Sequence, residues 1–240
     1  TPPKENTDIA KVSEIASKHM NRIESLDIDG VVLYDIQDES ARNEDARPFP
    51  FLPTFEPQKY SGDFLEGLDL PKVLFQVVGK HDEASLRTWM NKNVNNGDLA
   101  VFIGNSSSAQ ATDITMNKAF SLRSEYAERM LIGGVAIPER HYAKKDEHLR
   151  ISSKINNGVS FFTTQAVYNV EASKNMLSEY YYHSKKNNLP LVPIMMTFSP
   201  CGSTKTMDFM KWLGIHFPKW LKNDLTNSQD ILGASIDTCV

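Results

Sequence analysis

Apolar runs of strand length alternate with amphipathic segments of helix length along most of this chain, and this alternation constrains the fold more than any other feature. Continuous apolar strands separated by helices are typical of a parallel sheet that is covered on both faces. We expect strands at 31–34, 72–79, 99–104, 130–137, 159–165 and 191–197, and helices at 82–93, 113–129, 146–155 and 172–186.

A near-repeat supports regular βα units. Val94-Asn95-Asn96-Gly97 and Ile155-Asn156-Asn157-Gly158 each precede an expected strand. Asn and Gly tolerate the left-handed conformation that ends a helix, so each motif predicts a helix C-cap. Units of this size favour a (β/α)₈ TIM barrel over an open sheet. We therefore expect residues 1–240 to form a single barrel domain truncated at both ends, with the first and last strands missing.

Composition narrows the classes of partner and the compartment. The formal net charge is −4 over 240 residues, which argues against nucleic acid as the main partner. No apolar run approaches the roughly 20 residues that a membrane helix needs, so we expect no membrane insertion. The two cysteines, Cys201 and Cys239, are too few for a disulfide framework, which favours a reducing cytoplasm. The oligomeric state is left open, a homo-oligomer included.

Residues 36–66 depart from the alternating pattern. The segment is rich in charged residues and then in Pro and Phe, over Pro48 to Pro53. It is too long for an ordinary βα loop, and long loops of this kind are usually functional or disordered. Because its second half is too apolar for a linker, we expect an ordered active-site loop.

Polar side chains follow the expected strands, where a barrel has its catalytic end. Few of them are paired acids, which suits a bound organic ligand better than hydrolysis by two carboxylates. They are Tyr34-Asp35, Gly79-Lys80, residues 104–108, residues 138–141, Gln165 and residues 197–200.

Two segments resemble phosphate-binding loops. Residues 104–108 (GNSSS) suit either a phosphate cradle of backbone N–H groups or a plain serine-rich turn. Residues 201–206 (CGSTKT) lack the spacing of a phosphate loop, so that interpretation is rejected.

The histidines and one helix face offer further candidates. His141 follows an expected strand, in a segment that the sequence predicts to be a loop. It could serve as a proton carrier or as a structural residue. The six histidines show no metal-ligand spacing, and a loop separates His141 from His148, so no metal site is predicted. Glu147, Arg150 and Lys154 share one helix face. That face is either a solvated salt-bridge surface or a grip for ribose and pyrophosphate.

Five motifs, in order and in register, resemble those of methylenetetrahydrofolate reductases. Thr1-Pro2-Pro3-Lys4 is similar to the end of that family's Phe-Phe-Pro-Pro-Lys opening, and residues 136–141 (AIPERH) are similar to its Ala-Tyr-Pro-Glu-x-His. The family's Lys-Val-Asp-Ala-Gly and Ile-Thr-Gln segments are matched by residues 154–158 (KINNG) and 163–165 (TTQ). Residues 197–200 (TFSP) fall where it has a strand ending in Pro, and residues 217–220 (FPKW) resemble its Ile-Pro-x-Trp.

The resemblance implies a flavin-dependent (β/α)₈ barrel that passes hydride from NADH or NADPH through FAD to 5,10-methylenetetrahydrofolate, giving 5-methyltetrahydrofolate. Orientation of donor, flavin and acceptor then supplies most of the rate. Residue by residue, it makes Gln165 a contact of folate and nicotinamide and Thr206 a further substrate contact. The FAD contacts that it implies are Tyr34, Asn105, His141, Glu147, Arg150 and Lys154.

Departures from the family pattern keep other functions open. Asn105 or Ser107 stands where the family has an Asp that tunes flavin and pterin, and the family's catalytic acid would precede Thr1, where we expect Glu. The first hypothesis is a flavin-dependent reductase. The second is a folate-binding barrel that acts as a methyl-transfer partner, and the third is a non-catalytic regulatory or scaffold barrel.

Overall fold

Six strands form one sheet in a computed structural model that describes residues 1–40, 44–105 and 112–239. The strands follow one another in the sheet in chain order, and each pair with a described register runs parallel. They are β1 (Val31–Leu33), β2 (Lys72–Val77), β3 (Leu99–Ile103), β4 (Ile132–Ala136), β5 (Val159–Ala166) and β6 (Ile194–Thr197).

The strand order distinguishes between two kinds of α/β protein. A doubly wound sheet reverses its order at a switch point, whereas a singly wound sheet adds each strand beside the last. The order β1 to β6 has no reversal among the described strands. The predicted α/β class is therefore confirmed, and the sheet is consistent with part of a TIM barrel. Closure into eight strands stays a prediction.

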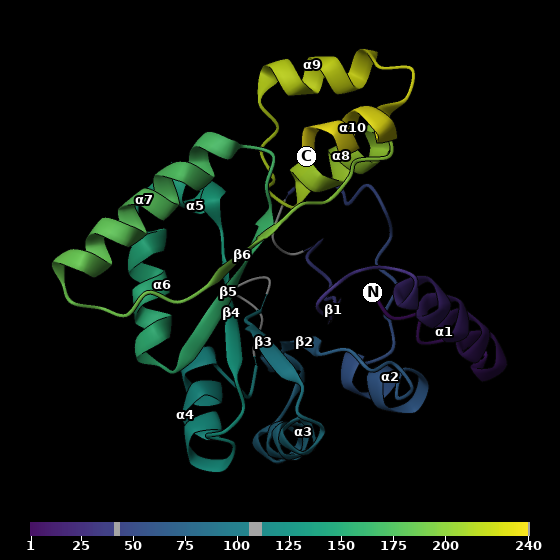
Figure 1. Ribbon diagram of the computed structural model, residues 1–240, viewed down its shortest axis with the longest axis vertical. Helices are drawn as coiled ribbons and strands as arrows, with labels where there is room; N and C mark the ends of the chain where they lie inside the picture. The colour runs from purple at the N-terminus through teal and green to yellow at the C-terminus, as the bar shows by residue number, and fades with distance from the viewer. Residues whose placement is uncertain (41–43, 106–111, 240) are drawn as a thin grey trace. The chain divides into compact units, whose positions relative to one another are not determined.

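The chain divides into two compact units, and a boundary between them along the chain falls within β4. Unit 1 comprises Thr1–Arg42 and Phe51–Gly133. Its core includes Leu74 and Val101 from the strands and Leu86 and Met90 from a helix, all fully buried. Besides strands, it contains α1 (Ile9–Glu24), α2 (Pro57–Phe64), the short 3₁₀ helix η2 (Val78–Lys80), α3 (Glu83–Asn96) and α4 (Met116–Tyr126) (Figure 1).

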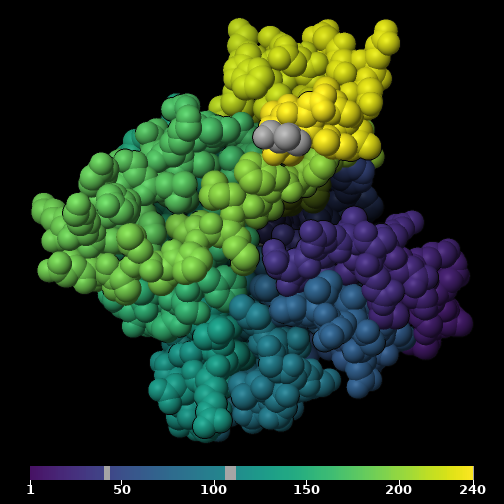
Figure 2. All heavy atoms as spheres, in the orientation of Figure 1, coloured from purple at the N-terminus to yellow at the C-terminus, as the bar shows by residue number. Residues whose placement is uncertain are grey.

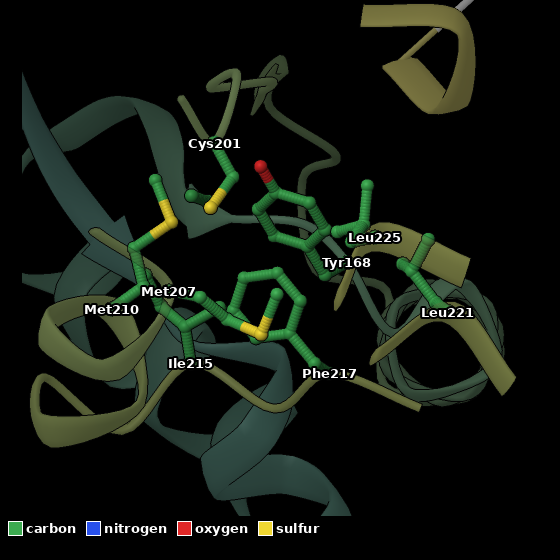
Figure 3. Packing of buried hydrophobic residues seen from close by; sticks show 9 residues of the cluster. Tyr168, Cys201, Met207, Met210, Ile215, Phe217, Leu221 and Leu225 are labelled. Carbon is green, nitrogen blue, oxygen red and sulfur yellow. The ribbon is translucent and has the colours of Figure 1, made fainter. Parts of the chain in front are cut away.

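Unit 2 comprises Asn43–Pro50 and Gly134–Val240. Figure 3 shows one of its buried clusters, in which Tyr168 packs against Phe217 beside Cys201 and the methionines of α8. Its helices are α5 (Pro138–Lys144), α6 (Glu147–Asn156), α7 (Val170–Lys186), α8 (Thr204–Trp212), α9 (Lys219–Asn227) and α10 (Ile231–Cys239).

Local sequence signals explain where several helices begin and end. Asp82 and Ser85 form a reciprocal capping box at the start of α3. Gly97 has φ 72° at the end of α3, and Gly158 has φ 88° after α6. Both glycines adopt the left-handed backbone that the two Asn-Asn-Gly motifs predict, so those C-caps are confirmed.

Two expectations about loops need correction. Residues 36–66 are not all loop, because Glu56 caps α2 and Pro57 starts it. Residues 138–141 are not a loop either: Pro138 opens α5, and His141 therefore lies on a helix. Helices α1, α8 and α9 were not predicted from the sequence.

The membrane prediction can be compared with the described helices. None of them combines the length and the apolar character that a membrane crossing requires. In the space-filling view, residues 51–133 of unit 1 are coloured blue to teal and residues 134–239 of unit 2 green to yellow (Figure 2).

Candidate functional site

A pocket of about 390 Å³ lies in unit 1, where β1, β2 and β3 end. This volume is in the range of small-molecule sites. Four of the residues predicted to follow strands line it: Asp35, Gly79, Lys80 and Asn105. The other lining residues are Glu5, Gln37, Asp38, Phe51, Pro53, Thr54, Glu56 and Val77.

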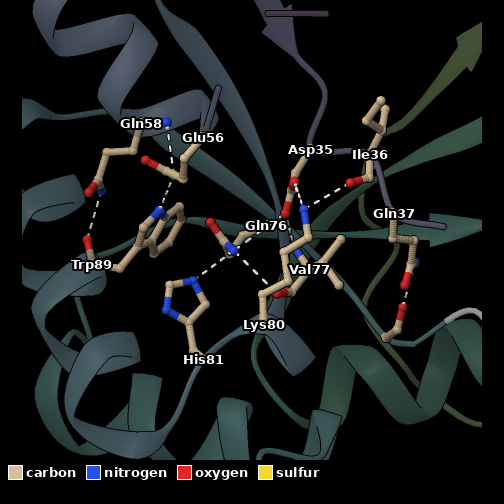
Figure 4. Close-up of polar contacts among 11 residues, drawn as sticks. Asp35, Ile36, Gln37, Glu56, Gln58, Gln76, Val77, Lys80, His81 and Trp89 are labelled. Carbon is tan, nitrogen blue, oxygen red and sulfur yellow. Dashed lines mark hydrogen bonds and ion pairs between the residues drawn. The ribbon is translucent and has the colours of Figure 1, made fainter. Parts of the chain in front are cut away.

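Asp35 is held in place by polar contacts on both carboxylate oxygens (Figure 4). Oδ1 pairs with the Lys80 ammonium, and Oδ2 accepts a hydrogen bond of 2.9 Å from the Val77 backbone N–H. Burial raises the pKa of this carboxyl above its usual range, and Lys80 opposes that rise. Lys80 also donates to the Ile36 carbonyl at 2.8 Å, so it joins the segment after β1 to η2.

A second layer of polar groups supports the pocket. The Gln76 amide lies 2.8 Å from His81 Nε2, and burial lowers the pKa of that histidine. Glu56 accepts a hydrogen bond from the Trp89 indole N–H at 3.0 Å, while its other contacts cap α2 (Figure 4). These contacts fix side chains from strand and helix around one cavity.

Gly79 lets Asn105 approach the backbone closely. A Cβ at position 79 would lie 1.9 Å from the Asn105 side-chain oxygen. The Asn105 amide donates to the Thr112 hydroxyl at 3.1 Å. Asn105, one of the predicted cofactor residues, therefore lines the pocket. Tyr34, another of them, is not among the lining residues, and its ring packs on Phe75 with centroids 4.5 Å apart. The predicted phosphate cradle falls mostly on residues 106–108, outside the described residues.

In unit 2, Glu147 forms a fully buried polar centre. Its carboxylate accepts from the Arg140 guanidinium at 2.9 Å and from the Ile137 backbone N–H at 3.0 Å. Arg150 lies 3.6 Å away on the same helix and is half exposed. The predicted common face of Glu147, Arg150 and Lys154 is confirmed, but burial of Glu147 rules out a wholly solvated face.

Lys154 points back toward β4. Its ammonium donates to the Val135 carbonyl at 2.7 Å and lies 5.8 Å from the centre of the Phe162 ring. Burial lowers its pKa from 10.5 to about 8. Gly134 leaves the space for this packing, since a Cβ there would lie 3.2 Å from Lys154 Cδ.

The remaining predicted residues of unit 2 have different surroundings. His141 is fully buried on α5, and its ring lies 5.5 Å from that of His148. The expectation that a loop keeps these two histidines apart is wrong, because α5 and α6 bring them together. The Gln165 side-chain amide donates a hydrogen bond to the Leu213 carbonyl at 2.9 Å. Thr206 lies in the first turn of α8, and its backbone N–H donates to the hydroxyl of Ser203, the N-cap of that helix.

Glu5 was not predicted as a pocket residue, while Gln37 and Glu56 lie in the 36–66 segment expected to be an active-site loop but were not singled out within it. None follows the end of an expected strand, and periodicity carries no signal in the segments that hold them. For Glu56, the acid directly before Pro57 was the available signal, since this pair is typical of a helix start.

Comparison with known proteins identifies the family. The family model described as methylenetetrahydrofolate reductase matches residues 104–234. This chain belongs to that family. No curated protein matches it.

One solved structure is similar over almost the whole chain. It is an uncharacterized protein from Clostridium thermocellum that binds two copies of 5-methyl-5,6,7,8-tetrahydrofolic acid. The sequence identity is 47% and the TM-score 0.83, and the match covers 99% of this chain and 77% of that one.

Proposed function

We propose that this chain binds a reduced folate and that its unit 1 pocket takes the pterin ring. Family membership and the similar protein that binds 5-methyltetrahydrofolic acid support this proposal. The polar residues at the ends of β1, β2 and β3 supply the contacts.

The charge of the pocket lining is the observation that carries the proposal. Among the described residues, the lining holds four carboxylates, those of Glu5, Asp35, Asp38 and Glu56, and one ammonium, that of Lys80. Such a lining disfavours phosphates and other anions. It suits the 2-amino-4-oxopyrimidine edge of a pterin, which carries N–H donors that carboxylates accept. The anionic glutamate tail of the folate would then extend away from the pocket.

Flavin-dependent reduction is the second candidate function. Arg150 favours this function, because its half-exposed guanidinium shares a face of α6 with Lys154. Two cations on one helix face suit the binding of a diphosphate. Bound FAD would supply hydride transfer from NADH or NADPH to the folate. The full set of implied contacts does not fit the cofactor, however, since His141 and Glu147 are fully buried and Glu147 is engaged by Arg140. We therefore derive no catalytic step through a flavin.

Binding without reduction is consistent with a methyl-transfer partner, and two measurements separate it from reduction. Calorimetric titration with 5-methyltetrahydrofolate tests binding: heat that saturates supports the proposal, and its absence from folded protein refutes it. Absorbance spectra with added FAD, followed by anaerobic NADH and NADPH, test reduction. A bound flavin that bleaches with either donor would favour the reductase, and a protein that takes up no FAD but binds folate would favour binding alone.

A further inference from the structure

Three side chains of metal-ligating types meet between helices α5, α6 and α7 of unit 2, and none of them lines the unit 1 pocket. His141 comes from α5, His148 from α6 and Glu179 from α7. Figure 1 shows the three helices side by side, and each contacts the other two. One ligand atom from each side chain lies within 4.8 Å of the other two.

Buried ring nitrogens of the two histidines lack the hydrogen bonds that a buried imidazole normally makes. His141 is fully buried, and neither of its ring nitrogens has a hydrogen-bond partner among the described residues. The same holds for Nδ1 of His148. An unsatisfied buried ring nitrogen costs free energy, so a ligand that takes its lone pair would stabilise the arrangement.

The spacing of the ligand atoms suits a metal ion better than direct hydrogen bonds. Glu179 Oε2 lies 3.6 Å from His141 Nε2 and 3.5 Å from His148 Nδ1. Zinc bonds to nitrogen and oxygen are about 2.0–2.2 Å, so ligand atoms around a tetrahedral ion are about 3.3 Å apart. Two of the three edges are therefore within a few tenths of an ångström of that separation.

We propose that His141, His148 and Glu179 bind one zinc ion that links α5, α6 and α7. Two imidazoles and a carboxylate form a donor set that suits a borderline ion such as Zn²⁺ better than Mg²⁺ or Ca²⁺. The fourth position is taken by water on the side of Glu179, whose side chain is 49% exposed. His183 borders the site, with its ring 5.2 Å from that of His148.

This assignment gives His141 a different role from the flavin contact that the family resemblance implies. It does not depend on folate binding, because the pocket residues and the zinc ligands belong to different units. Loss of either activity would leave the other measurable.

The test is zinc binding by the untagged full chain after removal of metal with a chelator. Competition with a chromophoric chelator should show one Zn²⁺ per chain, and Co²⁺ should give the intense visible absorption of tetrahedral coordination. Zn²⁺ at a hundredfold excess over its Kd should raise Tm by about 5 °C or more. Failure to bind Zn²⁺ would overturn the proposal.

Glu179→Gln and His148→Gln should each weaken zinc binding by tenfold or more. Both substituted side chains are at least partly exposed, so each variant is expected to fold, which circular dichroism verifies. The matched control is His216→Gln, another histidine of unit 2, whose ring stacks on Tyr142 instead. Equal zinc binding by wild type and by both ligand variants would refute the site, as would loss of binding in the His216 control alone.

Discussion

Asp35 and Lys80 form an ion pair in which the acid is buried and the base is not. The Asp35 side chain is 3% exposed and the Lys80 side chain 45%. The pair joins the end of β1 to the segment that follows β2, so it fixes one wall of the pocket. Burial raises the pKa of this carboxyl, and the ammonium and the Val77 N–H oppose that rise by compensating for lost hydration.

Removal of Lys80 should therefore cost more than removal of the pair. We expect Lys80→Met to lower the free energy of unfolding by about 1–3 kcal/mol, since it leaves the buried Asp35 carboxylate without its cation. Asp35→Asn combined with Lys80→Met should recover part of that loss. A double-mutant cycle from urea denaturation measures the coupling, and strict additivity of the two substitutions would contradict this account.

Gly79 should matter for ligand binding through Asn105. Alanine at position 79 would bring its Cβ against the Asn105 side chain, and the amide would have to leave its place beside Thr112. We expect Gly79→Ala to weaken folate binding by about tenfold, in line with the loss of one hydrogen bond to a ligand. Gly67→Ala is the control, because nothing lies within 4 Å of a Cβ there. Equal effects of the two substitutions would count against the role of Asn105.

The buried Glu147 should be essential for the stability of unit 2. Glu147→Ala leaves the Arg140 guanidinium and the Ile137 N–H without their acceptor, so we expect a loss of about 3–5 kcal/mol. Glu171 is a matched control, because it too lies in the first turn of a helix but is 77% exposed. Glu171→Ala should change stability by less than about 0.5 kcal/mol. Chemical denaturation decides, and similar losses in both variants would rule out the buried centre.

Lys154 should make stability rise with pH in the alkaline range. Burial lowers its pKa from 10.5 to about 8, Glu147 opposes that shift, and Arg140 and Arg150 add to it. Between these two pH values the unfolded chain binds more protons than the folded one, so the free energy of unfolding increases with pH, by up to about 3 kcal/mol. Lys154→Met should lack this increment. The test is the free energy of unfolding of wild type and Lys154→Met, measured by chemical denaturation from pH 7.5 to 10.5. The same pH dependence in both proteins would contradict the prediction.

Much of the sheet could be predicted because its strands carry long apolar runs. Residues 72–77 and 99–103 are strands as expected, and Gly97 and Gly158 end helices as their Asn-Asn-Gly motifs predict. Helix α2 was missed because it lies inside a segment rich in charge and proline, where its start signal, Glu56 before Pro57, is only two residues long.

The pocket could be predicted from the strand ends and from residues 36–66, which were expected to form an active-site loop and supply several of its lining residues. Asp35, Lys80 and Asn105 meet because parallel strands end at one edge of a sheet. The cluster of His141, His148 and Glu179 has no such rule behind it. It depends on how three helices pack, and Glu179 stands far along the chain from the two histidines. Spacing in the sequence carries no information about that contact.

The most direct test of the central claim is a calorimetric titration of wild type and Asp35→Asn with 5-methyltetrahydrofolate. Asp69→Asn, an exposed acid outside the pocket lining, is the control. We predict saturable binding by wild type and control, and binding at least tenfold weaker for Asp35→Asn. Absence of binding by the folded wild type, or equal affinity in all three proteins, would contradict a folate site at the ends of β1, β2 and β3.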